Sequence, residues 1–387
     1  MNNDIIFVYI TAYSPRMNII ASKRANLLSK YVSRKYKTYV VAGYPRATGA
    51  ITSTKRYSFD NYTLIEIPTL FPKLVRSRAT TQDRISKLSL LSRHCKIELL
   101  PVLELLFPIS PGGMLFHNKS RFIREIDKIV VANKNKKIIA FASYGPLFVL
   151  RIGSYLKKKY SNVQFMIDFR DWGYNYYEGL LYRSIVFRNI MGRLTRNADL
   201  VSAVSSILLR KYTKYFSLDA SKTIYLPNGY DNSETSIVSP IHKDSSCNSF
   251  VIAYTGSIHI KSRNPEKFVM ALRRVDVAAQ SCEVDVCLKF IYAGKDSELI
   301  RYYFRKHHLL HILEDRKFVS REESLKIQGE ADLLLLLTYT GVYKESFGSI
   351  ITGKIYEYLL SPAPILVIGQ DNWELGALIS TKDGSGL

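Results

Sequence analysis

Short apolar segments and longer amphipathic segments alternate along the first 230 residues of the chain. Runs rich in Val, Ile and aromatic residues occupy 5–10, 38–42, 63–67, 137–142, 163–168, 200–204 and 223–226. After the first run, residues 19–35 have apolar positions spaced as on one face of a helix. Strands that alternate with helices in this way form βαβ units. The first half is therefore predicted to be a doubly wound α/β domain around a parallel sheet.

A second alternating series begins at residue 250. It predicts strands at 250–255, 286–293, 332–338 and 364–368, a short apolar run at 316–319, and helices at 265–280, 297–307, 321–329 and 354–360. Residues 232–249 are rich in Ser and Thr and lack periodicity, as is typical of a linker. We therefore predict two Rossmann-like domains, at 1–235 and 250–387, joined by a linker at 236–249. Ligands are expected at the carboxyl ends of both sheets.

The composition of the 387 residues, 47% hydrophobic and 23% charged, is that of a globular protein and excludes disordered and fibrous classes. No apolar run approaches the roughly 20 residues of a membrane-spanning helix. Residues 5–10 follow Asp4 and lack a basic flank, so they are predicted to be a strand and not a signal peptide. The four cysteines form no CxxC pair, which favours a reducing cytoplasm and argues against a zinc site or a disulfide framework.

The formal net charge of +22 is concentrated in the first half of the chain. Residues 1–200 hold 33 Lys and Arg against 12 Asp and Glu, whereas residues 201–387 hold 22 against 21. A basic surface confined to one half favours an anionic partner, which leaves nucleic acid, an acidic bilayer face and a phosphorylated ligand open.

Two loops of the chain can be compared with common phosphate-binding motifs. The loop after the first strand, residues 11–18, contains no glycine, which disfavours a dinucleotide-binding domain with its G-x-G-x-x-G loop. Residues 348–354 fit G-x-x-x-x-G-K, but Ile355 stands where a P-loop has Ser or Thr, which argues against a P-loop NTPase. A loop of small residues before a helix still offers backbone N–H groups to a phosphate.

Five segments resemble glycosyltransferase family 4, whose members are retaining enzymes with the GT-B fold. In chain order they are Asp168–Trp172, Asn197–Ser205, Pro227–Asp231, Tyr254–Ser257 and Thr352–Leu366. The resemblance implies two Rossmann-like domains that face each other across a cleft. It also implies transfer of a sugar from a nucleotide-sugar donor in bacterial surface polysaccharide synthesis, such as that of capsule or O-antigen.

The resemblance assigns roles within the donor site of the second domain. The amides of Thr352 and Gly353 are expected to hold the nucleotide diphosphate, and Glu357 the ribose hydroxyls. Cations aimed at the departing diphosphate lower the barrier to transfer, and Lys261, Arg263 and Lys354 are the candidates. The predicted donor site is completed by Gly256, Ser257 and Ser349.

Candidate residues in the first domain follow its predicted fifth and seventh strands. Asp168, Arg170 and Asp171 are candidate catalytic groups on the acceptor side, with a structural ion pair as the alternative. Asn228 and Asp231 mark the predicted hinge between the domains. No DxD motif ends a strand, so neither a metal ion nor a cofactor is predicted.

The sequence departs from the family pattern at four points. The loop after the first strand lacks the usual pair of glycines. Ser257 stands where the family has an Arg on the diphosphate, and Ser349 stands where the first Glu of an E-x7-E pair is expected. The chain also ends at Leu387, before the last strand and the closing helix of the family. An impaired or truncated GT-B protein that binds only a nucleotide or a partner is therefore the alternative reading.

A basic and then aliphatic stretch at 71–125 favours docking on anionic lipid, with a pair of core helices broken at Pro101 as the alternative. The predicted partners are a UDP- or GDP-linked sugar donor, a lipid-linked saccharide acceptor and an anionic membrane surface. The protein is accordingly expected to be cytoplasmic and peripheral on the inner face of the cytoplasmic membrane. Nucleic acid is disfavoured as a partner because Leu runs, and not aromatic residues, lie among these cations.

Overall fold

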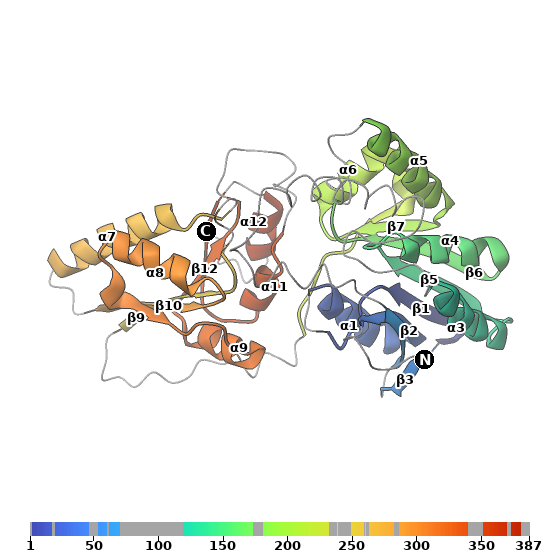
Figure 1. The fold of residues 1–387 in the computed structure, drawn as a ribbon, viewed down its shortest axis with the longest axis horizontal. Helices are drawn as coiled ribbons and strands as arrows, with labels where there is room; N and C mark the ends of the chain where they lie inside the picture. The colour runs from blue at the N-terminus through green and yellow to red at the C-terminus, as the bar shows by residue number, and fades with distance from the viewer. Residues whose placement is uncertain are drawn as a thin grey trace, which may run out of the picture. The chain divides into compact units, whose positions relative to one another are not determined.

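A computed structural model provides the structure of the protein. It describes residues 2–17, 20–45, 53–59, 62–69, 119–172, 181–231, 238, 249–258, 260, 263–281, 286–339, 351–369 and 373–380. Contacts divide the chain into two compact units, unit 1 (Met1–Pro227) and unit 2 (Asn228–Leu387). Each unit is an α/β body with its own sheet and its own helices (Figure 1).

Unit 1 is built on an eight-stranded sheet with the order β3-β4-β2-β1-β5-β6-β7-β8. The strands are β1 (Asn2–Thr11), β2 (Tyr36–Pro45), β3 (Lys55–Ser58), β4 (Tyr62–Thr69), β5 (Lys137–Ser143), β6 (Val163–Phe169), β7 (Leu200–Ala203) and β8 (Thr223–Tyr225). All neighbours pair in parallel except β3, which pairs antiparallel with β4 at the edge.

The alternation of side chains along β1 sends its residues into two different cores. Ile6, Val8 and Ile10 pack in a large core with the helices α3 (Lys119–Ala132), α4 (Phe148–Lys159), α5 (Leu181–Asn197) and α6 (Ser206–Phe216). Phe7 and Tyr9 pack on the other face with α1 (Ile20–Ser33). Because side chains alternate with a period of two, a strand apolar on both faces must be covered on both faces, as in a doubly wound sheet.

Unit 2 is built on a five-stranded parallel sheet with the order β11-β10-β9-β12-β13. The strands are β9 (Ser249–Thr255), β10 (Cys287–Ala293), β11 (Leu313–Asp315), β12 (Leu333–Leu337) and β13 (Ile365–Ile368). One core lies under α7 (Glu266–Ser281) and α8 (Ser297–Lys306), and the other lies under α9 (Arg321–Glu330), α11 (Lys354–Tyr358) and α12 (Trp373–Ser380). Both faces of this sheet are therefore covered as well (Figure 1).

The predicted alternation of strands and helices is confirmed in both halves, with three differences. The run predicted at 316–319 is wrong: the strand is β11 at 313–315, because Lys317 has a left-handed φ of 59°, which a strand does not accommodate. Strand β3 and helix α12 were not expected from the pattern. The stretch at 71–118 lies outside the described residues, while 119–125 begin α3, whose Phe122 is buried in the core of unit 1.

Two searches among the described residues complete the picture. None of their helices is both long enough and apolar enough to cross a bilayer. The same part of the chain contains no group of three His, Cys, Asp or Glu side chains arranged to hold a metal ion.

Candidate functional site

The carboxyl end of β9 carries the turn in which the sequence places the donor site. Gly256 follows the strand with a φ of 131°, and its amide donates to the carbonyl of Ala293 at 2.6 Å. A Cβ at this position would lie 2.2 Å from Cε of Lys354, a residue nearly one hundred positions later. Glycine is thus required both by the backbone conformation and by the passage of the lysine stem.

Lys354 is the first residue of α11, and its side chain occupies the slot between Gly256 and Tyr254. Its Nζ lies 3.8 Å from the centroid of the Tyr254 ring, a cation–π contact. The Nζ is buried, and no hydrogen-bond partner for it exists among the described residues. Burial, together with the nearby charge of Arg263, lowers the pKa of Lys354 from 10.5 to about 7.

The neighbours of Lys354 add one more unsatisfied group. The Oγ1 of Thr352 is buried without a hydrogen-bond partner in the described part of the chain, two residues before the lysine. Gly353 directly precedes α11, which has only five residues and therefore a small helix dipole. The main positive charge at this end of α11 is accordingly the ammonium of Lys354. Of the other predicted donor residues, Ser257 is half-buried and its carbonyl accepts from Tyr254 Oη at 3.0 Å. Lys261 and Ser349 lie outside the described residues.

The carboxylates near Lys354 are already engaged. Glu357, one turn along α11, forms an ion pair with Arg321 at the start of α9. Asp296 accepts from the Ile258 amide at 2.7 Å. Arg321 was missed by sequence reasoning, since it lies 36 residues from Glu357 and only the packing of α9 beside α11 on one face of the sheet brings the two together.

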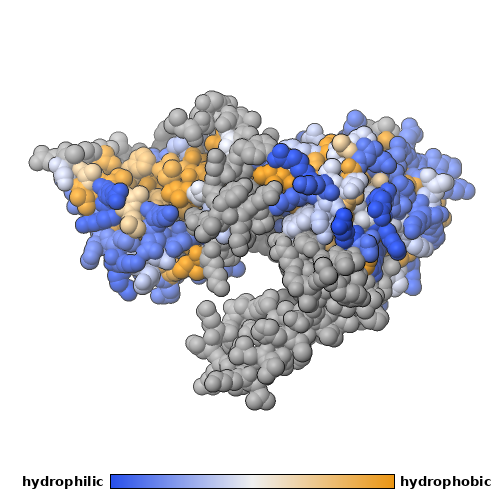
Figure 2. Space-filling model, turned by 90° about the horizontal axis from the view of Figure 1, so that it is seen from above, coloured by the Kyte–Doolittle hydropathy of each residue, from blue (hydrophilic) through white to orange (hydrophobic). Residues whose placement is uncertain are grey.

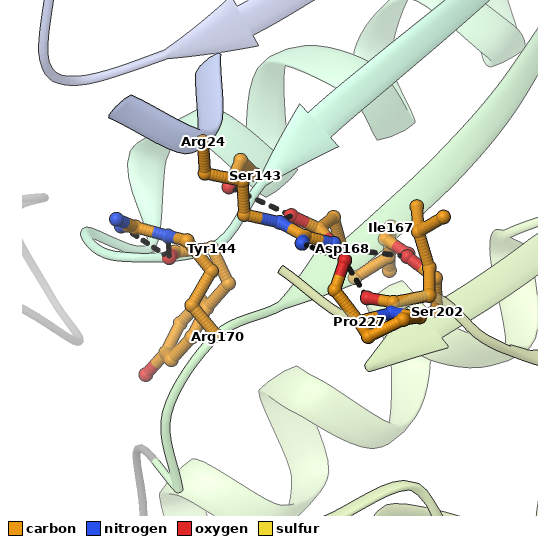
Figure 3. Close-up of polar contacts among 9 residues, drawn as sticks. Arg24, Ser143, Tyr144, Ile167, Asp168, Arg170, Ser202 and Pro227 are labelled. Atoms are coloured by element: carbon orange, nitrogen blue, oxygen red, sulfur yellow. Dashed lines mark hydrogen bonds and ion pairs between the residues drawn. The ribbon is translucent and has the colours of Figure 1, made fainter. Parts of the chain in front are cut away.

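In unit 1, Asp168 near the end of β6 is fully buried and fully paired (Figure 3). Its carboxylate accepts from Nε and Nη2 of Arg24 at 3.0 and 2.8 Å, from Ser143 Oγ at 3.0 Å and from Ser202 Oγ at 2.9 Å. Burial alone would raise the pKa of Asp168, but the Arg24 guanidinium and the hydroxyls hold that pKa below its usual range. This is the ion-pair alternative, and it leaves the carboxylate no free acceptor side.

The partner in this pair, Arg24 of α1, was not predicted from the sequence. Besides Asp168 it binds the carbonyls of Leu226 and Pro227 at 2.9 and 2.8 Å, where the chain leaves unit 1. A single buried guanidinium thereby ties α1, the centre of the sheet and the end of the unit together. Its signal in the sequence is weak, because Arg24 lies in a helix segment whose other cations, Lys23 and Lys30, belong to an ordinary amphipathic pattern.

The other two candidates of this segment point elsewhere. Arg170 donates to the carbonyl of Tyr144 at 3.2 and 2.9 Å and to that of Gly145 at 3.3 Å, and it is turned away from Asp168 (Figure 3). Asp171 is exposed, and its carbonyl accepts from Tyr212 Oη at 2.9 Å. The three predicted catalytic groups therefore do not form one cluster. The predicted hinge residues, Asn228 and Asp231, lie half-buried in an irregular segment at the start of unit 2.

Comparisons with known proteins place the fold and no more. No family model matches the chain, and no curated protein matches it. Among solved structures, sucrose-phosphate synthase from Thermosynechococcus elongatus is similar over 99% of this chain and 91% of its own, with a TM-score of 0.54 and 11% identity. The E. coli trehalose-6-phosphate protein bound with UDP-2-fluoro glucose is similar over 98% and 91%, with a TM-score of 0.54 and 10% identity.

A third structure agrees with the first two. The α,α-trehalose 6-phosphate synthase from Burkholderia multivorans is similar over 98% of this chain and 89% of its own, with a TM-score of 0.54 and 8% identity. At such low identity the likeness establishes architecture alone. The predicted fold class is confirmed: the chain has the two-unit, mostly parallel α/β architecture of the GT-B glycosyltransferases.

Proposed function

We propose that the protein is a glycosyltransferase that takes a sugar from a nucleotide-sugar donor held by unit 2. The observation that carries the proposal is the buried amino group of Lys354, which has no hydrogen-bond partner among the described residues. A buried unpaired cation costs several kcal/mol. We infer that an anionic group supplies the missing charge in the working protein, and the diphosphate of a nucleotide sugar matches that requirement.

The chemistry of the transfer uses the same cation. The bond between the anomeric carbon and the diphosphate oxygen breaks while that carbon bonds to a hydroxyl oxygen of the acceptor. The departing nucleoside diphosphate keeps the electron pair and gains negative charge, and the hydroxyl proton passes to it. A protonated Lys354, with Arg263 beside it, stabilises that charge where it develops. Thr352 Oγ1, buried without a partner in the described part of the chain, offers a neutral donor to the same phosphate group.

For the donor and the stereochemistry of the transfer, the support comes from the family-4 sequence segments and from the similar solved structures. A UDP-linked donor is supported by the E. coli neighbour bound with UDP-2-fluoro glucose. Retention of configuration is supported by the family-4 segments and by a similar trehalose-6-phosphate synthase solved in a study of glycosyltransfer with retention, at a TM-score of 0.53 and 11% identity.

For the acceptor we propose a lipid-linked saccharide of bacterial surface polysaccharide synthesis. This rests on the family-4 segments and on the cationic first half of the chain. The similar structures include a sucrose-phosphate synthase and a trehalose 6-phosphate synthase, whose names contain sugar phosphates. A soluble sugar phosphate is therefore the alternative class of acceptor. Either acceptor is anionic and suits a basic unit 1.

Calorimetric titration of the full chain with UDP, GDP and inorganic diphosphate tests the donor site. We expect UDP or GDP to bind, and the Lys354→Met variant to lose affinity by about tenfold to a hundredfold, as for a charged hydrogen bond. Lys267→Met, an exposed lysine on α7, is the matched control and should bind as the parent does. Gly256→Ala should also lose binding, since its Cβ displaces the lysine. No response to any nucleotide overturns the proposal.

Release of nucleoside diphosphate from a nucleotide sugar separates the enzyme from the impaired GT-B alternative. The expected result is that UDP release accelerates when a lipid-linked saccharide is added and stays slow with glucose 6-phosphate. Acceleration by the sugar phosphate alone would replace the acceptor assignment. Tight UDP binding with no release under either condition would favour a protein that only binds the nucleotide.

A further inference from the structure

Helices α5 and α6 of unit 1 carry cations and no carboxylate. Their sequences, LYRSIVFRNIMGRLTRN and SILLRKYTKYF, contain seven Lys and Arg and neither Asp nor Glu. The α5–α6 surface is defined here by the exposed cations Arg188, Arg193, Arg196, Arg210 and Lys214. Such a surface repels itself unless an anionic partner neutralises it.

Four of these cations, Arg188, Arg193, Arg196 and Lys214, form no ion pair with any described residue, whereas some cations of other helices do. On α4, Lys157 pairs with Asp199 at 2.6 Å and Lys159 with Asp127 at 2.8 Å. On α8, Arg301 pairs with Asp315 at 2.7 Å. The α5–α6 surface is thus a group of exposed cations that no acidic side chain of either helix neutralises.

Aromatic side chains pack between the two helices that carry these cations. Phe187 of α5 and Phe216 of α6 have ring centroids 6.4 Å apart, and the guanidinium of Arg188 lies 5.4 Å from the Tyr215 ring across the helix pair. Tyr215 in turn meets Trp172 edge-on at 5.6 Å. These contacts join the two helices, so the cations of both belong to one packed helix pair.

We propose that the α5–α6 surface docks the protein on an anionic lipid bilayer. Each Lys or Arg near an acidic bilayer face strengthens the attraction, so several together give a large increase in affinity. Figure 2 looks onto unit 1 from the side where Figure 1 draws α5 and α6, and the surface there is mostly hydrophilic with small scattered hydrophobic areas. At this surface the attachment is therefore electrostatic.

A single-stranded nucleic acid fits this surface less well. Non-specific binding of single strands depends on open aromatic faces on which bases stack. Among the described aromatic residues here, Trp172 packs on Tyr212 at 4.8 Å and Tyr215 packs on Phe216 at 4.9 Å, and both are partly buried at the margin of the unit 1 core. Phosphates would be attracted, but these two rings are not open faces on which bases could stack.

Vesicle co-sedimentation of the full chain tests the proposal. With vesicles of phosphatidylcholine containing about 30% phosphatidylglycerol, we expect binding at low salt that weakens steeply as salt rises to about 0.5 M. Pure phosphatidylcholine vesicles should bind little. The triple variant Arg193→Gln, Arg196→Gln, Lys214→Gln should need at least about tenfold more anionic lipid for half-binding.

The matched control removes the same charge from unit 2. Lys267→Gln, Arg274→Gln, Arg305→Gln replaces three exposed cations of α7 and α8 and should shift half-binding by less than about twofold. Equal binding to neutral and anionic vesicles, or equal losses in the two triple variants, overturns the proposal. Tighter binding of the parent to a single-stranded oligonucleotide, lost in the α5–α6 variant, would also overturn the proposal.

The membrane-docking proposal rests on the proposed glycosyltransferase function, because it names the surface on which that enzyme would meet its acceptor. UDP titration of the α5–α6 variant separates failure of the surface from failure of the donor site, because UDP binding should be unchanged.

Discussion

Two buried charges lie at the carboxyl ends of the two sheets, and they are treated in opposite ways. In unit 1, the carboxylate of Asp168 receives hydrogen bonds from a guanidinium and two hydroxyls. In unit 2, the ammonium of Lys354 lies over an aromatic ring with no hydrogen-bond acceptor in the described residues. The pKa of each group reports the difference, since that of the aspartate is lowered by its partners and that of the lysine is lowered by burial.

The contrast separates a charge that is satisfied within the fold from the charge to which we assign the donor. A buried charge with complete partners contributes to the uniqueness of the fold, and removing one member leaves the other uncompensated. A buried charge without partners destabilises the folded protein until a ligand neutralises it, which is a common state of binding and catalytic groups. The comparison therefore predicts that deleting the two charges changes stability with opposite signs.

The largest expected effect is the loss of stability in Asp168→Ala. The substitution leaves Arg24, whose side chain is 3% exposed, without a counter-ion, and should lower the free energy of unfolding of unit 1 by about 3–5 kcal/mol. Each unit holds one of the two tryptophans, Trp172 or Trp373, so fluorescence of a Trp373→Phe background follows unit 1 in urea. A change below about 1 kcal/mol would show that the pair is not structural.

The control for this experiment is an ion pair on the surface of the same unit. Asp127→Ala removes the partner of Lys159, whose side chain is 40% exposed, and should change the stability of unit 1 by no more than about 1 kcal/mol. Replacing both buried partners, as in Arg24→Met with Asp168→Leu, should recover part of the loss, since no buried charge is then left alone.

Lys354→Met should act in the opposite direction. Without ligand it removes an unpaired buried cation, so unit 2 should gain about 1–3 kcal/mol, measured by Trp373 fluorescence in a Trp172→Phe background. Because the pKa of Lys354 is near 7 in the folded protein and 10.5 when unfolded, the unfolded chain holds the extra proton between these values. The stability of the parent therefore rises with pH across that window, and the gain in the variant is largest below pH 7. A loss of stability on substitution would mean that Lys354 has a structural counter-ion.

The sequence predicted the fold almost completely because the fold depends on local patterns. Alternating apolar residues on strands and one-sided apolar faces on helices set the two sheets, and those patterns lie within a dozen residues. The strand at 313–315 was placed three residues late, since the left-handed backbone at Lys317 is a turn property that hydrophobicity does not report. The fold class follows from the order of elements and not from any one motif.

The candidate sites were predicted less fully because their partners come from distant segments. Lys354 was found through the loop before its helix, but its slot is made by Gly256 and Tyr254, about one hundred residues earlier. Asp168 was singled out in its segment, yet its environment is set by Arg24, 144 residues away. In both sites the sequence motifs identified one residue, and only the packing of the folded chain identified the residues that surround it.

The third expected effect is a pH dependence of nucleotide affinity. In the proposed donor site UDP binds more tightly when Lys354 is protonated, so the affinity should fall by up to about tenfold per pH unit above pH 7, where the nucleotide's own charge stays nearly constant. Calorimetry in two buffers of different ionisation enthalpy should show nearly one proton taken up per UDP at pH 8. Lys354→Met should show no uptake, and uptake equal to that of the parent would assign the proton to another group.

The smallest expected effect concerns Glu357, which already pairs with Arg321. If Glu357 accepts from the ribose hydroxyls, Glu357→Gln should weaken UDP binding by about fivefold, the value of one modest hydrogen bond, and leave inorganic diphosphate unaffected. Glu322→Gln, an α9 carboxylate whose side chain is 67% exposed, is the control and should change neither affinity. Glu357 also supports the protonated form of Lys354. Equal weakening of UDP and diphosphate would therefore mean that Glu357 acts on the charge of the lysine and not on the sugar of the nucleotide.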